Sequence, residues 1–258
     1  MTVAEIQHHA PVKRKLVASV AASTDEVREA QRLRWRVFAR DGGAHIPGAD
    51  AGLDVDAFDP YCAHILVRDT SSDQVIGTYR ILTGAASQHT GGFYSETEFD
   101  LERLSHLRPR IAELGRSCVH PDYRSGGVIA LLWGAIADYI AEQKCDVLIG
   151  CASVPMRDGG HTAATLHRQL SATHLAPIDY RVTPRTPLSL EGLDPHRSIT
   201  IPPLIKGYMR AGAWVCGAPH WDPDFNTADF LMMLQLGQLD RRYARHYLAP
   251  AEIVAAEW

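Results

Sequence analysis

The amino-acid sequence predicts an α/β fold in which helices flank a mixed, mostly antiparallel central sheet. Apolar β-rich runs and helical spacings follow one another in the order strand, helix, hairpin, strand, helix, strand. The 258 residues, 46% of them hydrophobic, are enough for a full core. Without a repeat or a clear linker, we expect a single domain over residues 1–258, with a core at about 15–156 and a C-terminal elaboration at about 157–258.

Local signals place the elements of the first half. Residues 15–20 alternate like a strand, and Ser23 to Glu26 form a capping box that predicts a helix continuing to about Arg40. The β-rich runs 62–69 and 74–82 surround the turn-forming sequence Ser-Ser-Asp, which predicts a hairpin.

The second half continues the alternation. Residues 110–120 predict a strand, 127–143 a long amphipathic helix and 146–154 a buried strand. Beyond residue 157 we expect a helix at 161–170, a Pro-rich connector, a strand at 212–219 and a final helical stretch.

Composition excludes several classes of protein. The net charge of −4 and pI near 6.3 give no basic field, so we expect no nucleic-acid partner. Five widely spaced cysteines without a C-x-x-C pair predict free thiols in a reducing compartment. The N-terminal sequence lacks an apolar signal region, and no run of about 18 apolar residues occurs, so we expect a cytoplasmic protein.

The segment from Glu113 to Ile140 has the pattern of an anion site. A predicted strand leads through a proline turn and a basic Gly-Gly loop into a helix, whose N-terminus offers unpaired N–H groups and a positive dipole end. The residues expected to surround a phosphate are Arg124, Ser125, Gly126, Gly127, Val128 and Ile129. The alternative is an ordinary glycine-capped turn.

Charged side chains in semi-apolar surroundings form a second pattern. Buried charges need partners, so we expect Arg80 and Arg116 to pair with Asp or Glu. In a regular strand Glu113 and Arg116 would point to opposite faces unless a bulge intervenes. The set comprises Arg36 beside Phe38, Asp54, Asp56, Asp59, Arg80, Glu98, Glu113 and Arg116.

These motifs resemble known families. Arg124-x-x-Gly127 is similar to the acyl-coenzyme A signature of GNAT N-acetyltransferases, although Ile129 stands where a second Gly or Ala belongs. The acidic loop 54–59, Arg80, Phe93 and Glu113-x-x-Arg116 resemble acyl-homoserine-lactone synthases. From about Leu33 to Leu248 the chain looks like the ornithine N-acyltransferases and N-acyl amino acid synthases of the GNAT superfamily.

The resemblance implies a GNAT fold and a transfer reaction. A fatty acyl group, 3-hydroxylated in that family, would pass from acyl carrier protein to the α-amine of ornithine and give lyso-ornithine lipid. The donor would be an acyl-phosphopantetheine thioester, with no permanently bound cofactor. Ile129 disfavours a pyrophosphate loop and favours the single phosphodiester of acyl carrier protein. The histidines show no metal-ligand spacing, so we expect no metal.

Aminolysis of a thioester needs a base, because the amine must lose a proton. The resemblance favours Glu113 in this role, with Asp56 second and Arg116 beside it. An N–H freed near Cys118 or Val119 would stabilise the oxyanion. Alternatively, Glu113 is paired permanently with Arg80 or Arg116. Cys118 as a nucleophile lacks a His-Asp partner, and His120 fits a structural turn better. Substrate contacts would come from Arg36, Phe38, Asp54, Asp59, Arg80, Phe93 and Glu98.

Two other functions stay open, namely another N-acyl amino acid or acyl-homoserine-lactone synthase, and a non-catalytic module that binds acyl carrier protein. Candidate contacts with an acidic carrier are Arg181, Arg185, Lys206, Arg210, Arg241 and Arg242. The segment 231–248 fits two interpretations, a peripheral membrane contact at the inner membrane face or a piece of the core.

Overall fold

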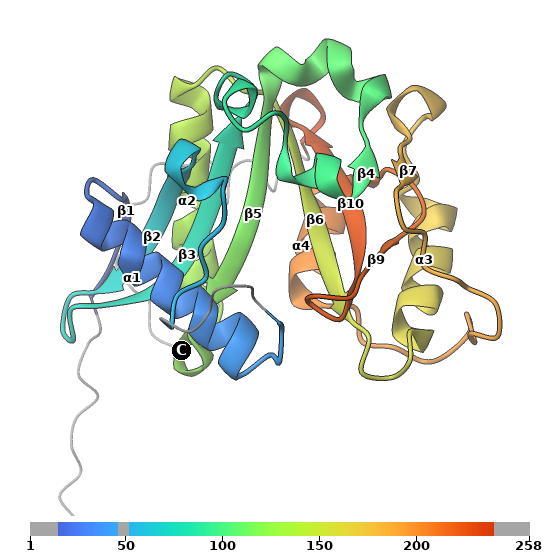
Figure 1. Cartoon of the computed structure of the whole chain (residues 1–258), viewed down its shortest axis with the longest axis horizontal. Helices are drawn as coiled ribbons and strands as arrows, with labels where there is room; N and C mark the ends of the chain where they lie inside the picture. The colour runs from blue at the N-terminus through green and yellow to red at the C-terminus, as the bar shows by residue number, and fades with distance from the viewer. Residues whose placement is uncertain (1–14, 46–51, 240–258) are drawn as a thin grey trace, which may run out of the picture.

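The computed structural model describes residues 15–45 and 52–239, which build an eight-stranded sheet. Its order is β1-β2-β3-β5-β6-β10-β8, with β9 also paired to β10 (Figure 1). Among these strands, only β5 and β6 run parallel. The strands are β1 Leu16–Val20, β2 Ala63–Asp69, β3 Gln74–Thr83, β5 Ile111–Val119, β6 Val147–Pro155, β8 Trp214–Val215, β9 His220–Asp222 and β10 Thr227–Gln235.

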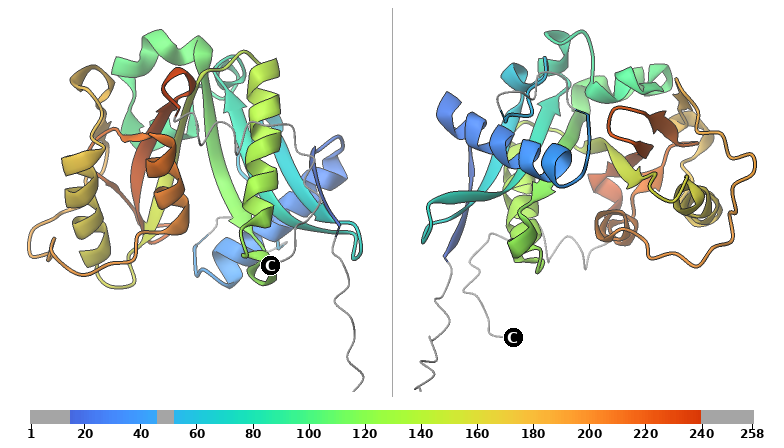
Figure 2. Two further views of the ribbon diagram at one scale, coloured as in Figure 1. Left: turned by 180° about the vertical axis from the view of Figure 1, so that it is seen from behind. Right: turned by 60° about the horizontal axis from the view of Figure 1, so that its bottom comes forward.

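Helices cover both faces of the sheet, as predicted. Helix α1 (Thr24–Trp35) continues into a π-helical turn, Arg36–Arg40, and lies in front of β2, β3 and β5 in Figure 1. Helix α2 (Gly127–Glu142) covers the opposite face, seen from behind in Figure 2. The predicted helix start at Ser23 is confirmed, because its hydroxyl accepts from the Glu26 N–H at 3.3 Å, whereas the Glu26 carboxylate accepts from the N–H of Ala22 at 2.6 Å, one residue before the N-cap position of a regular capping box.

The C-terminal part belongs to the same sheet. Helices α3 (His161–Thr173) and α4 (Pro203–Ala211) join α2 on one face and bury Leu166, Leu170 and Ile205 in a common core (Figure 2). On the other face, the 3-10 helices η5 (Tyr94–Thr97) and η6 (Glu102–Arg110) and the β4–β7 pair (Phe99–Asp100 with Thr183–Pro184) enclose a second core. Strands from both sides of residue 157 therefore share one sheet.

Two C-terminal expectations were wrong. Within the described residues the expected final helical stretch is strand β10, whose residues 227–234 are buried, and the rest of it, from residue 240, lies outside them. Residues 203–211 of the Pro-rich connector form helix α4. A strand covered on both faces is apolar at successive positions, so its sequence lacks the period of two that identifies a half-buried strand. Pairing with β6 along nine residues decides the structure of this run.

The burial of β10 also bears on the proposed membrane contact. Met232 is 4% exposed and Met233 1% exposed, so the core interpretation is confirmed for these residues and the membrane interpretation is wrong for them. Arg241, Arg242 and Arg245 lie outside the described residues. Over residues 15–45 and 52–239 the structure has no helix with the length and apolarity needed to cross a membrane.

The parallel strands β5 and β6 separate soon after they begin. Their register covers only Ile111 with Val147, Ala112 with Leu148 and Glu113 with Ile149. Strand β6 continues along β10 instead, and β5 continues along β3. The carboxyl-terminal halves of β5 and β6 therefore diverge, and side chains from both strands face the space between them.

Close packing of α2 against β3 sets the position of the helix N-terminus. A Cβ placed on Gly77 would lie 2.4 Å from Cγ1 of Val128, in the first turn of α2. Val128 is 2% exposed and its branched side chain has little freedom to move away. Only glycine at position 77 allows this approach.

We expect Gly77→Ala to lower the free energy of unfolding by about 1–3 kcal/mol, because the added methyl group overpacks this contact. Urea denaturation measures the change. Adding Val128→Ala should restore the space, so the double variant should lose less than the sum of the two single losses. Strictly additive losses would contradict this account of the contact.

Candidate active site

A network of buried charges joins the first half of the chain. Arg34, on α1, is fully buried, and its Nε atom lies 2.8 Å from Oδ2 of Asp54. Its Nη2 atom donates to Oδ2 of Asp59 at 2.6 Å, and its Nη1 donates to Oδ1 of Asp59 at 3.1 Å. Burial alone would raise the pKa of Asp59, but the guanidinium groups of Arg34 and Arg80 outweigh it and hold that pKa well below its usual range.

Two further arginines close this network into a cycle. Arg80 Nη1, on β3, donates to Asp56 Oδ1 at 2.6 Å and to Asp59 Oδ1 at 2.8 Å. Arg116, on β5, reaches Asp56 Oδ2 at 3.1 Å and Asp54 Oδ2 at 3.3 Å. Arginines and aspartates thus alternate in what we call the charge ring, formed by Arg34, Asp54, Arg116, Asp56, Arg80 and Asp59. The expected acidic pairing of Arg80 and Arg116 is confirmed.

A bulge in β5 lets Arg116 join the ring. Thr78 pairs with Cys118 while Arg80 pairs with Gly115, so two residues of β5 face one residue of β3. Arg116 has a positive φ of 52°, and its guanidinium carbon lies 4.8 Å from the ring centre of Tyr94 and 4.9 Å from that of Phe225. The bulge that the sequence left open is therefore present at residues 116–117.

The charge ring borders a cavity of about 340 Å³, which we call the polar cavity. Arg80 and Arg116 line it from the ring, and Phe38, Phe58, Tyr94 and Phe225 supply aromatic walls. Glu98, Glu113, Asp222 and Asp229 bring carboxylates to the same space. It lies where β5 and β6 diverge, since residues of both strands line it.

Glu113 has other partners than the sequence suggested. Its carboxylate accepts from the N–H groups of Tyr94 and Ser95 at 2.7 Å and 2.6 Å, and from the Ser95 hydroxyl at 2.5 Å. It forms no ion pair with Arg80 or Arg116, which bind aspartates, so the interpretation of a permanent pair was wrong. Burial raises the pKa of Glu113, although the hydrogen bonds from Ser95 and Tyr94 oppose the rise.

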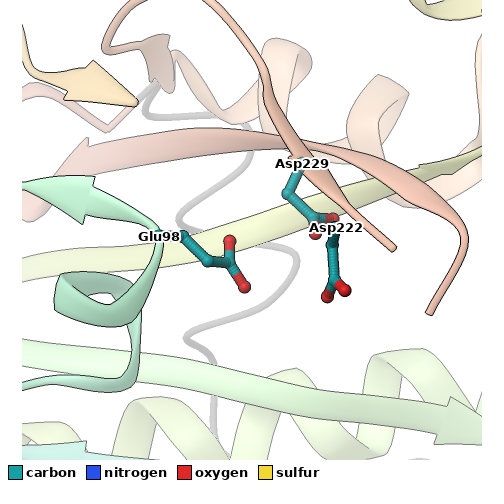
Figure 3. A group of neighbouring side chains, drawn as sticks. All are labelled: Glu98, Asp222 and Asp229. Carbon is teal, nitrogen blue, oxygen red and sulfur yellow. The ribbon is translucent and has the colours of Figure 1, made fainter. Parts of the chain in front are cut away.

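Three carboxylates gather at one part of the polar cavity, and we call them the acidic cluster: Glu98, Asp222 and Asp229 (Figure 3). One oxygen from each lies within 4.8 Å of the others. Burial, and then the charge of Asp229, raise the pKa of Glu98 to about 8, and burial raises the pKa of Asp229 to about 6.

A second, mostly apolar cavity of about 550 Å³ lies beside the first, and we call it the apolar cavity. Residues of α2, α4 and β5 line it, including Ile129, Trp133, Ile136 and Cys118. Three exposed basic residues, Arg124, Lys206 and Arg210, also contribute to its lining. Both cavities share Val37, Ser117, Leu204 and Tyr208, so they meet beside the bulge of β5.

The predicted phosphate loop lies at the edge of the apolar cavity. Gly126 adopts a left-handed φ of 102° before the first turn of α2, and a Cβ on Gly126 or Gly127 would meet open space. Arg124, Gly126 and Ile129 line the cavity, and Ser125 is exposed beside them. Val128 instead packs in the core against Gly77, so its side chain is unavailable to a ligand.

The break in strand pairing lies earlier than expected. Cys118 and Val119 are paired with Thr78 and Gly77, whereas the ladder is interrupted at Arg116 and Ser117. The predicted residues do line the apolar cavity. Burial raises the pKa of the Cys118 thiol to about 12, which opposes a nucleophilic thiolate.

The remaining predicted contacts divide into two groups. Phe38 lines the polar cavity and contacts Phe225 edge to face, at 6.2 Å between ring centres. Arg36 lies 3.0 Å from His120 Nε2, and Phe93 is 2% exposed in the core beneath Arg108. Neither Arg36 nor Phe93 lines the polar cavity, and Asp54 and Asp59 are enclosed within the charge ring.

The sequence interpretation missed four residues of the site: Arg34, Tyr208, Asp222 and Asp229. Arg34 lies on α1, one turn before Phe38 in the π-helical turn that continues it. Several other arginines surround it in the sequence, so nothing distinguished Arg34 from surface residues. Asp229 stands near the beginning of the apolar strand β10, and a charged residue within such a strand is a signal that could have been used. Tyr208, whose hydroxyl is hydrogen-bonded to that of Tyr79, lies on a helix that was not predicted.

Known proteins resemble this chain in sequence and in fold. Residues 33–134 match the family model of the acetyltransferase (GNAT) domain. The chain is 36% identical over 255 residues to the L-ornithine N(alpha)-acyltransferase of Rhizobium meliloti (strain 1021), covering 92% of this chain and 85% of that protein. The enzyme of the same name from Agrobacterium fabrum is 37% identical over 256 residues, covering 92% and 86%.

The chain belongs to the L-ornithine N(alpha)-acyltransferase family. It is therefore an acyltransferase with a GNAT fold, as the motifs predicted. Among solved structures, the N-acyl amino acid synthase FeeM from uncultured soil microbes aligns with a TM-score of 0.53 at 13% identity, covering 92% of this chain and 98% of FeeM. The AHL synthase LasI aligns with a TM-score of 0.51 at 14% identity, covering 95% and 100%. These likenesses concern the fold.

We expect Asp59→Asn in this acyltransferase to lower the free energy of unfolding by about 3–5 kcal/mol, because the buried ring would then hold three guanidinium groups and only two carboxylates. Chemical denaturation measures the loss. Asp25→Asn is the matched control, since the side chain of Asp25 is 91% exposed. A loss at Asp59 no larger than at Asp25 would contradict a structural role for the charge ring.

The raised pKa of Glu98 predicts a pH-dependent stability. The folded protein holds this proton up to about pH 8, whereas the unfolded chain releases it near 4.5, so the contribution of Glu98 to stability falls as the pH rises between these values. Between pH 5 and pH 8 the unfolding free energy of Glu98→Gln should rise by about 1–3 kcal/mol relative to that of the wild type. Thermal melting across this range tests it, and parallel curves would refute it.

Proposed function

We propose that this enzyme transfers a fatty acyl group from acyl carrier protein to the α-amine of ornithine. The observation that carries the proposal is the junction of the two cavities at Ser117 and Tyr208. The apolar cavity is suited to the acyl-phosphopantetheine donor, and the polar cavity with its carboxylates is suited to a dibasic acceptor. The product would be lyso-ornithine lipid, and the reaction would be the first step of ornithine lipid synthesis.

Charge at the apolar cavity supports a carrier protein as the donor. Arg124, Lys206 and Arg210 are exposed and line this cavity, and an acidic carrier would be attracted to them. Two of the other predicted contacts are engaged within the fold, since Arg181 donates to the Ala176 carbonyl and Arg185 to the Glu96 carbonyl. Ile129, in place of a small residue, adds to the preference for a single phosphodiester.

In this proposal Glu113 is the base that takes the proton of the α-ammonium, directly or through one water. The carboxylate lines the polar cavity, and its burial raises its pKa, which makes it a stronger base. Asp56 is a weaker candidate, because both of its oxygens bind guanidinium groups of the charge ring. The interrupted pairing at Arg116 and Ser117 provides the backbone N–H groups for the oxyanion.

The leaving group also needs a proton. Collapse of the tetrahedral intermediate breaks the carbon–sulfur bond and releases the phosphopantetheine thiolate. The hydroxyl of Tyr208, which lines both cavities and is hydrogen-bonded to Tyr79, would donate this proton and recover one from solvent. Glu113 passes the first proton, taken from the α-ammonium, to solvent before the amine adds to the thioester carbonyl and forms the carbon–nitrogen bond. It then takes the second proton from the nitrogen of the intermediate as the carbon–sulfur bond breaks, which leaves the amide.

The decisive experiment incubates the enzyme with ornithine and either a 3-hydroxyacyl carrier protein or the matching acyl-coenzyme A, with mass spectrometry of the product. We expect N-acylated ornithine with the carrier. Reversing Lys206 and Arg210 to Glu should raise KM for the carrier at least about tenfold at low salt and less at high salt. Equal efficiency with the acyl-coenzyme A would refute acyl carrier protein as the specific donor. A lactone formed from S-adenosylmethionine would refute ornithine as the acceptor.

We expect Glu113→Gln to lower kcat at least about 100-fold, as for loss of a general base. The variant should also melt at a lower temperature, because an amide NH₂ would face the N–H groups of Tyr94 and Ser95. Ser95→Ala is the control, since it removes one donor and keeps the carboxylate. If Ser95→Ala loses as much kcat as Glu113→Gln, Glu113 acts by positioning η5 and not as the base.

A further inference from the structure

The acidic cluster lies apart from the charges that hold the fold together. Glu98 ends η5 just before β4, Asp222 ends β9 and Asp229 lies within β10. Their side chains converge in Figure 3, and the residues are 4%, 8% and 2% exposed, respectively. Glu98 and the two aspartates of the β9–β10 hairpin, far apart in the sequence, are thus buried around one point of the polar cavity.

The fold satisfies this cluster only in part. Asp222 Oδ1 accepts from the N–H groups of Asp224 and Phe225, and Asp229 accepts from the Thr227 hydroxyl at 3.2 Å and 3.3 Å. Glu98 Oε2 is buried and has no hydrogen-bond partner within the described residues. None of the ion pairs found in residues 15–45 and 52–239 includes a member of the cluster.

Buried carboxylates without counter-ions are costly, whereas every aspartate of the charge ring has two arginine contacts. A cationic ligand would favour the ionised form of these carboxyl groups and donate to the unsatisfied oxygen of Glu98. An ammonium group offers three donors and matches three converging acceptors.

The reacting amine is a poor candidate for this position. Surrounding carboxylates stabilise the protonated form of an amine and raise its pKa, whereas the nucleophile has to lose its proton. The cluster residues line the polar cavity and not the apolar cavity, which takes the acyl donor in the proposed function. The geometry fits an amino acid whose α-amine is at the junction and whose second amine is at the cluster.

We infer that Glu98, Asp222 and Asp229 form the subsite for the terminal, non-reacting ammonium of a diamino acid acceptor. This inference rests on the proposed function, because it assigns one end of the same acceptor. The subsite selects the acceptor by charge: a neutral side chain of equal length would leave the cluster unpaired and bind less well. Recognition of the second amine and activation of the first then belong to different carboxylates.

The test compares ornithine with norvaline, which has the same carbon chain without the terminal amine. Variants Asp229→Asn and Glu98→Gln each remove one ionisable carboxyl group with little change in shape, and Asp179→Asn and Glu191→Gln are exposed matched controls. We expect the wild type to favour ornithine over norvaline by at least about 100-fold in kcat/KM. Each cluster variant should reduce this ratio at least about tenfold, and the controls should keep it.

The other outcomes overturn the inference. If the cluster variants lose equal activity with ornithine and with norvaline, the cluster acts in the chemical step. If the ratio of kcat/KM for ornithine over norvaline is unchanged, the cluster does not recognise the second amine. Activity that is lost on chelation and restored by Mg²⁺ or Ca²⁺ would make it a metal site. Calorimetric titration with ornithine and norvaline gives the same comparison without turnover. It therefore decides the inference even if no acylated product forms and the proposed function fails.

Discussion

The alternating charge ring is the interaction on which the rest of the site depends. It ties α1, the segment 54–59, β3 and β5 together through ion pairs that are mostly buried. Buried ion pairs contribute little net stability, but loss of one member is severe, so such a ring specifies one arrangement of its elements. Because Arg80 and Arg116 line the polar cavity, this constraint also fixes one of its walls.

The same cavity contains charges of two kinds. The aspartates of the charge ring are neutralised by arginines, and Glu113 is bound by N–H and O–H donors that connect β5 to η5. The acidic cluster lacks such counter-ions. A protein accepts buried carboxyl groups without counter-ions where a ligand supplies the partner, at some expense in the stability of the free protein. In the inference drawn above, the charge ring builds the site and the acidic cluster selects its ligand.

The divergence of β5 and β6 creates the space for both substrates. Three residue pairs hold the strands together, after which β5 bulges toward the charge ring and β6 follows β10. On one side the opening continues into the apolar cavity between α2 and α4, and on the other into the polar cavity. In the proposed function an acyl thioester and an amine approach the same stretch of β5 from different directions, which suits a direct transfer between them.

The sequence by itself determined the elements whose signals are local. The helix start at Ser23, the hairpin after Cys62 and the glycine loop before α2 each depend on a few adjacent residues, and their structures agree with the predictions. The pairing of Arg80 and Arg116 with acidic residues also followed from the need to neutralise buried charge. Only the tertiary structure decided which carboxylate each arginine binds, that the apolar run of β10 is a strand, and that Asp229 meets Glu98, because these contacts join residues far apart in the chain.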